Sequence, residues 1–160
     1  MPKKAILAIA AASVIAIPLI SSAGPLSQSV KETKTGLVRH SKKIPQCAHV
    51  TSVDRGRVQT LNYGYSTVDA IYETDENNKL QSVTLYGAAG IKNDSQLRAM
   101  SCATIALMMT NQPKYQTIDQ ATNATAHLWK MSLKAPFTMA HFFDQITAQH
   151  APFQAKLWNK

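Results

Sequence analysis

The spacing of apolar residues becomes strand-like in the middle of this 160-residue chain and helical after it, and that order limits the folds open to the chain. Residues 57–65, 67–74 and 79–86 are rich in valine, threonine, leucine and tyrosine, which predicts three strands of an antiparallel meander. A polar turn at 75–78 joins the second strand to the third. After residue 93 the apolar spacing becomes helical. Strands followed by helices predict an α+β domain, in which the helices cover the sheet.

Proline residues separate three predicted helices in the second half of the chain. These helices span 93–111, 117–135 and 138–150. Thr117 and Gln120 have the spacing of a capping box at the start of the second helix. The sequence therefore predicts a three-stranded meander covered by three C-terminal helices.

Residues 1–23 have the pattern of a secretory signal. Two early lysines are followed by an apolar run over 5–20 and by small residues at 21–23, which is the usual order of a cleaved signal peptide. The run is shorter than the roughly 20 residues that span a bilayer, and an uncleaved membrane anchor is the alternative. We expect a periplasmic or secreted protein with no transmembrane segment after cleavage. Its mature chain, 24–160, is predicted to be a single domain that begins with a helix at 29–43.

The only two cysteines are Cys47 and Cys102. Two are too few for a cysteine-rich scaffold or a four-cysteine zinc site. In an oxidising compartment an even count favours a bridge, which here would contribute about 4 kcal/mol by closing a long loop. A redox pair is the alternative, but the chain has no C-x-x-C motif. We predict one structural disulfide.

Motifs of common enzymes are missing from the sequence. The chain has no G-x-S-x-G, H-E-x-x-H, Walker or dinucleotide-binding glycine motif. Its histidines do not form a complete ligand set for a metal. We therefore predict no catalytic residues, no metal and no cofactor. A weaker alternative is a small hydrolytic enzyme whose site is assembled from distant residues such as His127, His141 and Asp144.

An acidic hairpin with tyrosines is a candidate surface for binding another protein. The net charge between residues 69 and 79 is −3, and tyrosine combines a large contact area with a polar tip. Packing within the sheet is the alternative for the tyrosines. We expect a non-catalytic protein-binding factor, such as an inhibitor, an immunity protein or an accessory protein of an envelope system. The candidate contact residues are Tyr65, Asp69, Tyr72, Glu73, Asp75 and Glu76.

A basic segment near the N-terminus gives the alternative function. The net charge between residues 31 and 57 is +5, which attracts anionic envelope material such as lipopolysaccharide, lipid headgroups or wall polymer. A solvated basic face without a ligand is the other interpretation. Nucleic acid is not expected, because aromatic residues are not interleaved with the basic ones as in single-strand binding platforms. The candidate anion-binding residues are Lys31, Lys34, Arg39, Lys42 and Lys43.

Overall fold

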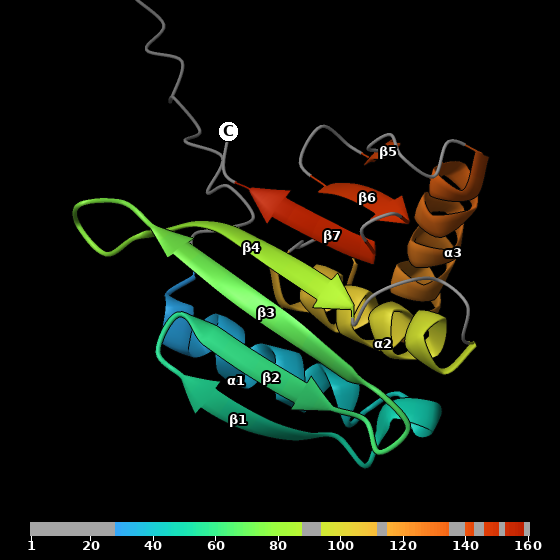
Figure 1. Cartoon of the computed structure of the whole chain (residues 1–160), viewed down its shortest axis with the longest axis horizontal. Helices are drawn as coiled ribbons and strands as arrows, with labels where there is room; N and C mark the ends of the chain where they lie inside the picture. The colour runs from blue at the N-terminus through green and yellow to red at the C-terminus, as the bar shows by residue number, and fades with distance from the viewer. Residues whose placement is uncertain are drawn as a thin grey trace, which may run out of the picture.

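An antiparallel sheet with helices packed on one of its faces forms the part of the chain that the computed structural model describes (Figure 1). That part comprises residues 28–87, 94–111, 115–134, 140–142, 146–150 and 153–158, so the predicted signal lies outside the described residues. The α+β class is confirmed. In chain order the elements are α1 (Val30–Ser41), a 3-10 turn (Pro45–Cys47), β1 (Thr51–Arg55), β2 (Val58–Asn62), β3 (Thr67–Thr74), β4 (Leu80–Gly87), α2 (Asp94–Asn111), α3 (Ile118–Lys134), β5 (Ala140–Phe142), β6 (Ile146–His150) and β7 (Phe153–Trp158).

The sheet is larger than the predicted meander. The three predicted strands are β2, β3 and β4, and they are antiparallel neighbours. The described residues add β1 beyond β2, and β7, β6 and β5 beyond β4, in the order β1-β2-β3-β4-β7-β6-β5. The predicted layout therefore contains three of the seven sheet strands that the structure describes.

The third predicted C-terminal helix, over 138–150, is wrong. The structure has β5 and β6 in this region, followed by β7. Strand β7 pairs with the edge of β4 that β3 leaves free, from Ser82 opposite Trp158 to Tyr86 opposite Gln154. Pairing with this edge overrides the local helical preference of the segment, and the edge belongs to a strand far away in sequence.

Helix α1 begins at a capping box that fixes its first turn. The backbone N–H of Glu32 donates to Ser29 Oγ at 3.2 Å, and the Glu32 carboxylate accepts from the Ser29 backbone N–H at 2.8 Å. These bonds lower the pKa of Glu32. The inner side of the helix then passes close to α2, where Gly36 lies against Thr110.

The core lies between the helices and the covered face of the sheet. Its largest fully buried side chains come from α1 and the turn after it, from the sheet strands, and from helices α2 and α3. They are Leu37, Ile44, Leu61, Tyr72, Leu80, Leu85, Met100, Met108 and Leu128. No helix within the described ranges combines the length and apolar character needed to cross a membrane.

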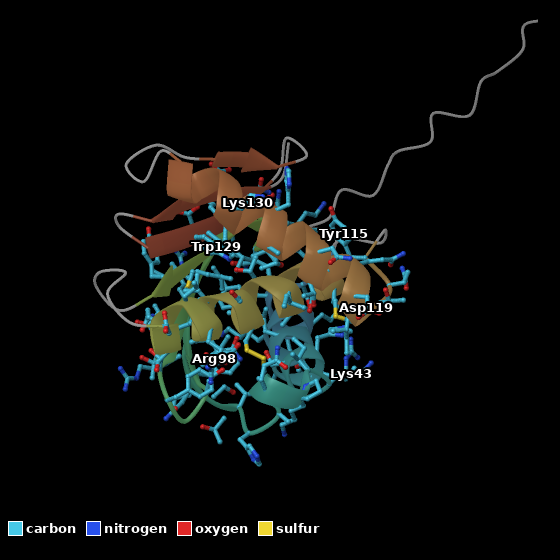
Figure 2. The ribbon with its side chains drawn as sticks, turned by 90° about the vertical axis from the view of Figure 1, so that its right-hand side faces the viewer. Lys43, Arg98, Tyr115, Asp119, Trp129 and Lys130 are labelled. Atoms are coloured by element: carbon cyan, nitrogen blue, oxygen red, sulfur yellow. A yellow bond between two sulfur atoms is a disulfide. The ribbon has the colours of Figure 1, made fainter. Side chains whose placement is uncertain are left out.

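The predicted disulfide is confirmed. Cys47, in the 3-10 turn, is bonded to Cys102 in α2, and both are buried (Figure 2). The bridge therefore ties the connection between α1 and β1 to the middle of the helical layer. The predicted capping box at the start of α3 is also present, because the Gln120 backbone N–H donates to Thr117 Oγ1 at 3.2 Å.

Candidate functional site: the basic side of helix α1

Three acidic residues of the β3–β4 hairpin, Asp69, Glu73 and Asp75, have partners within the protein. The Asp75 carboxylate accepts from the backbone N–H groups of Asn77 and Lys79, each at 2.9 Å, and so holds the turn. Asp69 accepts from Thr60 Oγ1 at 2.6 Å. These carboxylates are used in shaping the hairpin and the sheet face, whereas Glu76 lies exposed at the tip.

Glu73 lies on the sheet face opposite the helices and binds across two strands. Its carboxylate accepts from the Ser82 hydroxyl and from Lys156 Nζ, the latter at 3.1 Å. Both interactions favour the charged form and lower the pKa of Glu73, with the Ser82 bond contributing most. Glu73 therefore joins β3 to β4 and β7.

The two predicted contact tyrosines point away from this acidic set. Tyr72 is buried on the helix-covered face, with only 1% of its surface exposed, and its hydroxyl donates to Gln59 Oε1 at 2.6 Å. Tyr65 is half-buried near the disulfide, with its hydroxyl 3.5 Å from Cys102 Sγ. The guanidinium of Arg98 lies 5.4 Å from the centre of the Tyr65 ring. The six predicted contact residues therefore do not form one surface.

The five predicted anion-binding residues do share one helix and the turn that follows it. They lie on α1 or immediately after it, and all except Lys34 are exposed. We call Lys31, Lys34, Arg39, Lys42 and Lys43 the α1 basic face. Among the described residues, only Lys34 of this set forms an ion pair.

Lys34 has a structural role. Its Nζ lies 2.6 Å from Asp54 Oδ1, also donates to the Gly56 carbonyl, and sits 5.4 Å from the centre of the Tyr72 ring. The hydrogen bond from Lys34 is the main cause of the lowered pKa of Asp54. Because Lys34 fastens the β1–β2 turn to α1, it is not free to bind a ligand.

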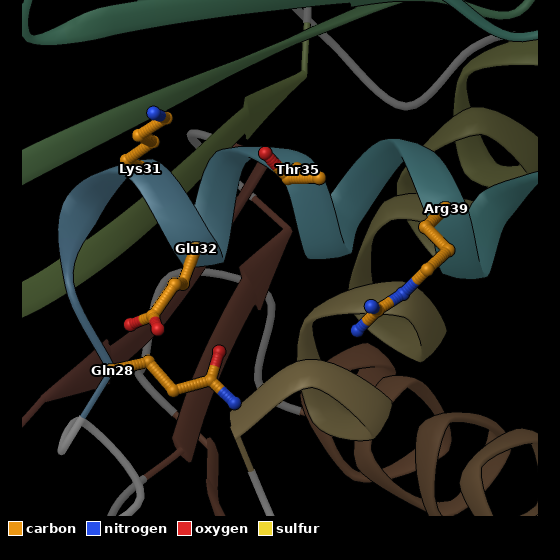
Figure 3. Close-up of a pocket in the computed structure, with 5 residues that line it drawn as sticks. All are labelled: Gln28, Lys31, Glu32, Thr35 and Arg39. Carbon is orange, nitrogen blue, oxygen red and sulfur yellow. The ribbon is translucent and has the colours of Figure 1, made fainter.

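A first hollow lies on the α2 side of α1. Figure 3 shows the Gln28 amide and the Arg39 guanidinium pointing to the same side of the helix. Gln28 Nε2 donates to the Thr110 carbonyl of α2 at 2.8 Å. The hollow has a volume of about 500 Å³, and its other lining residues include Lys31 and Glu32. Because a carboxylate stands among its cations, this hollow is of mixed charge.

A second hollow lies between α1 and the edge strand β1, and it is predominantly basic. Its volume is about 700 Å³. Arg39 and Lys42 line its helical wall, Val38 adds an apolar surface, and buried Gln59 belongs to the adjacent strand β2. We call this hollow the α1–β1 groove; its lining residues are Lys34, Thr35, Val38, Arg39, Lys42, Ser52, Asp54 and Gln59.

Charge within the groove is unbalanced. Asp54 is its one carboxylate and is neutralised by Lys34, whereas Arg39 and Lys42 have no ion-pair partner among the described residues. Burial first, and then the charges of Arg39 and Lys43, lower the pKa of the neighbouring His40. An anion bound in the groove would therefore contact two cations that have no ion-pair partner among the described residues.

Sequence reasoning missed the β1 side of this groove. Thr51–Arg55 contains two charged residues and has no buried position, so it lacks the apolar alternation of a half-buried strand. The available signal is Gly56, which has a φ of +74° in the two-residue turn between β1 and β2.

The proposed scattered enzyme site cannot be followed in full. Asp144 lies outside the described residues, as does the side chain of His141. Within the described ranges, no group of three or more histidine, cysteine, aspartate or glutamate side chains has an arrangement able to hold a metal ion. His127 lies on α3, and the residues that line the α1–β1 groove come from other elements.

No protein-family model, curated protein or solved structure matches this chain. The site is therefore interpreted from its own residues.

Proposed function

We propose that the protein is exported and binds an anionic partner through the exposed cations of the α1 basic face, which leave out Lys34, with the α1–β1 groove as the centre of the site. The observation that carries this proposal is the pair Arg39 and Lys42, which line a hollow and have no ion-pair partner among the described residues. Binding needs no enzymatic step, in agreement with the prediction of a non-catalytic factor. Roles as an inhibitor, an immunity protein or an accessory protein all remain compatible with it.

The acidic hairpin supports a binding role less well. A partner that approached Asp69 or Glu73 would compete with bonds that already hold the sheet together. A partner at Arg39 or Lys42 would break no ion pair of the described residues. For this reason we place the binding surface on α1 and keep the hairpin as the sequence-based alternative.

Two features support export. The N-terminal segment has the order of charges and apolar residues found in secretory signals. The Cys47–Cys102 disulfide is compatible with an oxidising compartment. Cell fractionation followed by mass spectrometry of the mature N-terminus tests the idea. We expect a chain that begins at Gly24 in the extracytoplasmic fraction, and a cytoplasmic chain that keeps residues 1–23 would contradict it.

Binding to anions is tested with vesicles and with a soluble polymer. Phosphatidylglycerol vesicles and polyglutamate offer phosphate and carboxylate groups, respectively, and phosphatidylcholine vesicles serve as the neutral control. We expect the affinity for at least one anionic probe to fall steeply as salt rises, because the Debye length is about 8 Å at 0.15 M. An affinity for phosphatidylcholine vesicles equal to that for the anionic probes would show that charge is not what the protein recognises.

The α1 basic face is tested with a matched pair of double variants. Arg39→Ala with Lys42→Ala removes two groove cations. The control, Lys79→Ala with Lys130→Ala, removes an exposed cation from the β3–β4 turn and another, Lys130, from α3, where Figure 2 labels it. At about 1 kcal/mol per cation near an anionic surface, the groove variant should bind roughly 30-fold more weakly at low salt. The control variant should change affinity by much less. Equal losses in the two variants would show that net charge alone, rather than this face, governs binding.

A further inference from the structure

The β1 strand beside the basic groove is an edge of the sheet. It stands first in the strand order, with β2 on one side, and all five of its residues are exposed. Val53 is 54% exposed, which leaves a large apolar side chain open to solvent on this strand. An edge strand presents a row of unpaired backbone N–H and C=O groups that can accept another strand.

The register identifies which backbone groups of β1 point outward. Two backbone hydrogen bonds, from Tyr72 N–H to the Arg57 carbonyl and from Tyr63 N–H to the Ser66 carbonyl, show that odd-numbered residues of the β2 region bond to β3. Because bonding alternates along an antiparallel strand, the even-numbered residues 58, 60 and 62 bond to β1. Their partners in β1 are residues 55, 53 and 51. The N–H and C=O groups of residues 52 and 54 therefore point away from the sheet.

The same two residues line the α1–β1 groove. Ser52 and Asp54 place their side chains on the helix side of the sheet, next to Arg39 and Lys42 of the groove wall. A strand added to β1 would bond to the backbone of Ser52 and Asp54. Every second side chain of that strand would enter the groove, and the alternate ones would cover Val53 on the opposite face.

Charge decides the kind of strand that fits. The groove already pairs its single carboxylate with Lys34, so further cations would be repelled by Arg39 and Lys42 and acidic side chains would be attracted. A second copy of this chain is disfavoured as the occupant, because antiparallel pairing of two β1 strands would bring two basic grooves together.

We infer that the anionic partner is an extended polypeptide segment that adds to β1 as a further antiparallel strand and directs acidic side chains into the α1–β1 groove. This inference rests on the proposed function, because it uses the same cations. It adds the chemical class of the partner and the geometry of its binding: backbone pairing supplies affinity, and alternation of acidic side chains supplies selectivity.

The probe is a short capped peptide in which glutamate alternates with threonine and valine. When the glutamates lie opposite Ser52 and Asp54, their side chains enter the groove and their backbone groups form hydrogen bonds with β1. One derivative carries N-methyl groups on the glutamate amides, which removes the donors that face β1. The matched derivative carries them on the threonine and valine amides, which face away, and has the same charge and composition.

Binding is followed by amide hydrogen exchange, resolved by NMR, and by titration. We expect the unmodified peptide and the threonine/valine-methylated peptide to slow exchange at the Ser52 and Asp54 amides by about tenfold or more. The Val53 amide, already bonded to β2, is the internal control and should change little. The glutamate-methylated peptide should fail to bind, and Arg39→Ala with Lys42→Ala should weaken the unmodified peptide by about tenfold or more.

The outcomes separate this inference from the function on which it rests. Equal binding of the two methylated peptides, or no added protection at Ser52 and Asp54, overturns strand addition even if the groove cations are required. Failure of the unmodified peptide to bind overturns it as well, while the vesicle and polyglutamate assays decide anion binding independently. Equal binding of the peptide to wild type and to the groove variant counts against the α1 basic face itself. A concentration-dependent dimer in light scattering, with Ser52 and Asp54 protected without peptide, would assign the edge to a second copy.

Discussion

The close contact between Gly36 and Thr110 predicts an unusual response to an alanine substitution. In the interior of a helix, glycine to alanine is normally stabilising, by about 0.5–1 kcal/mol. Here a Cβ at position 36 would lie 2.7 Å from Thr110 Oγ1 and even closer to the threonine methyl group. Both residues are buried, so the side chain has no open space to move into.

The net effect can be worked out from these two contributions. Overpacking of a buried contact typically costs about 1–3 kcal/mol. After subtraction of the gain in helix propensity, Gly36→Ala should lower the free energy of unfolding by roughly 1 kcal/mol. When Thr110 is alanine, both atoms of the worst clash are gone and only its Cβ remains, at 3.2 Å. In that background Gly36→Ala should be neutral or stabilising by about 0.5 kcal/mol.

A double-mutant cycle measures this change of sign. Circular dichroism follows the urea unfolding of wild type, the two single variants and the double variant, and the four curves are fitted with a common dependence of the unfolding free energy on urea. We expect the resulting coupling energy to be about 1.5 kcal/mol. The single Thr110→Ala variant accounts for the loss of the threonine's own bond to the Ala106 carbonyl. A coupling energy below about 0.5 kcal/mol, or stabilisation by Gly36→Ala in both backgrounds, would refute the steric argument.

Three further predictions concern the core and its pH dependence. Replacing Cys47 and Cys102 with alanine should cost about 4 kcal/mol in the chain-entropy model, and a loss under about 1 kcal/mol in urea melts would contradict it. Because burial lowers the pKa of His40 below 6.5, the free energy of unfolding should fall as pH drops below 6.5. His40→Gln should flatten this part of the pH profile, and an unchanged profile would contradict the role of His40. Tyr72→Phe should cost about 1–3 kcal/mol by leaving a buried amide oxygen without its donor, whereas Tyr86→Phe at an exposed tyrosine should change unfolding by less than about 0.5 kcal/mol.

Features that depend on local sequence were predictable. The Thr117–Gln120 capping box involves residues three positions apart, and its bonds are present. The disulfide followed from there being only two cysteines in a chain with a secretory pattern. The strands β2, β3 and β4 followed from β-branched and aromatic residues separated by turns.

Features that depend on distant pairing were not predictable in the same way. In β6 and β7, apolar residues alternate with polar ones at Ile146 and Ala148 and again at Ala155 and Leu157, which was a usable strand signal. The alanine and glutamine content of the region favours a helix locally, and the β4 edge that selects a strand lies in another part of the chain.

The candidate site shows the same limit. Its cations were found by their clustering in sequence, but nothing local shows that Lys34 is held by Asp54 while Arg39 has no ion-pair partner in the part of the chain that the structure describes. The groove exists because β1 lies beside α1, and β1 has too few apolar residues to be predicted as a strand from its pattern alone.

The position of β7 has a consequence for how the molecule folds. This strand is the last in chain order, yet it lies between β4 and β6, so it joins the two halves of the sheet. The halves meet only when β7 reaches β4 across the whole of α2 and α3, and closing so long a loop is entropically costly and slow. Until then the edge of β4 is open to strands of other chains. Aggregation therefore competes with folding most strongly just before the last strand docks, and the yield of refolded protein should fall as its concentration rises.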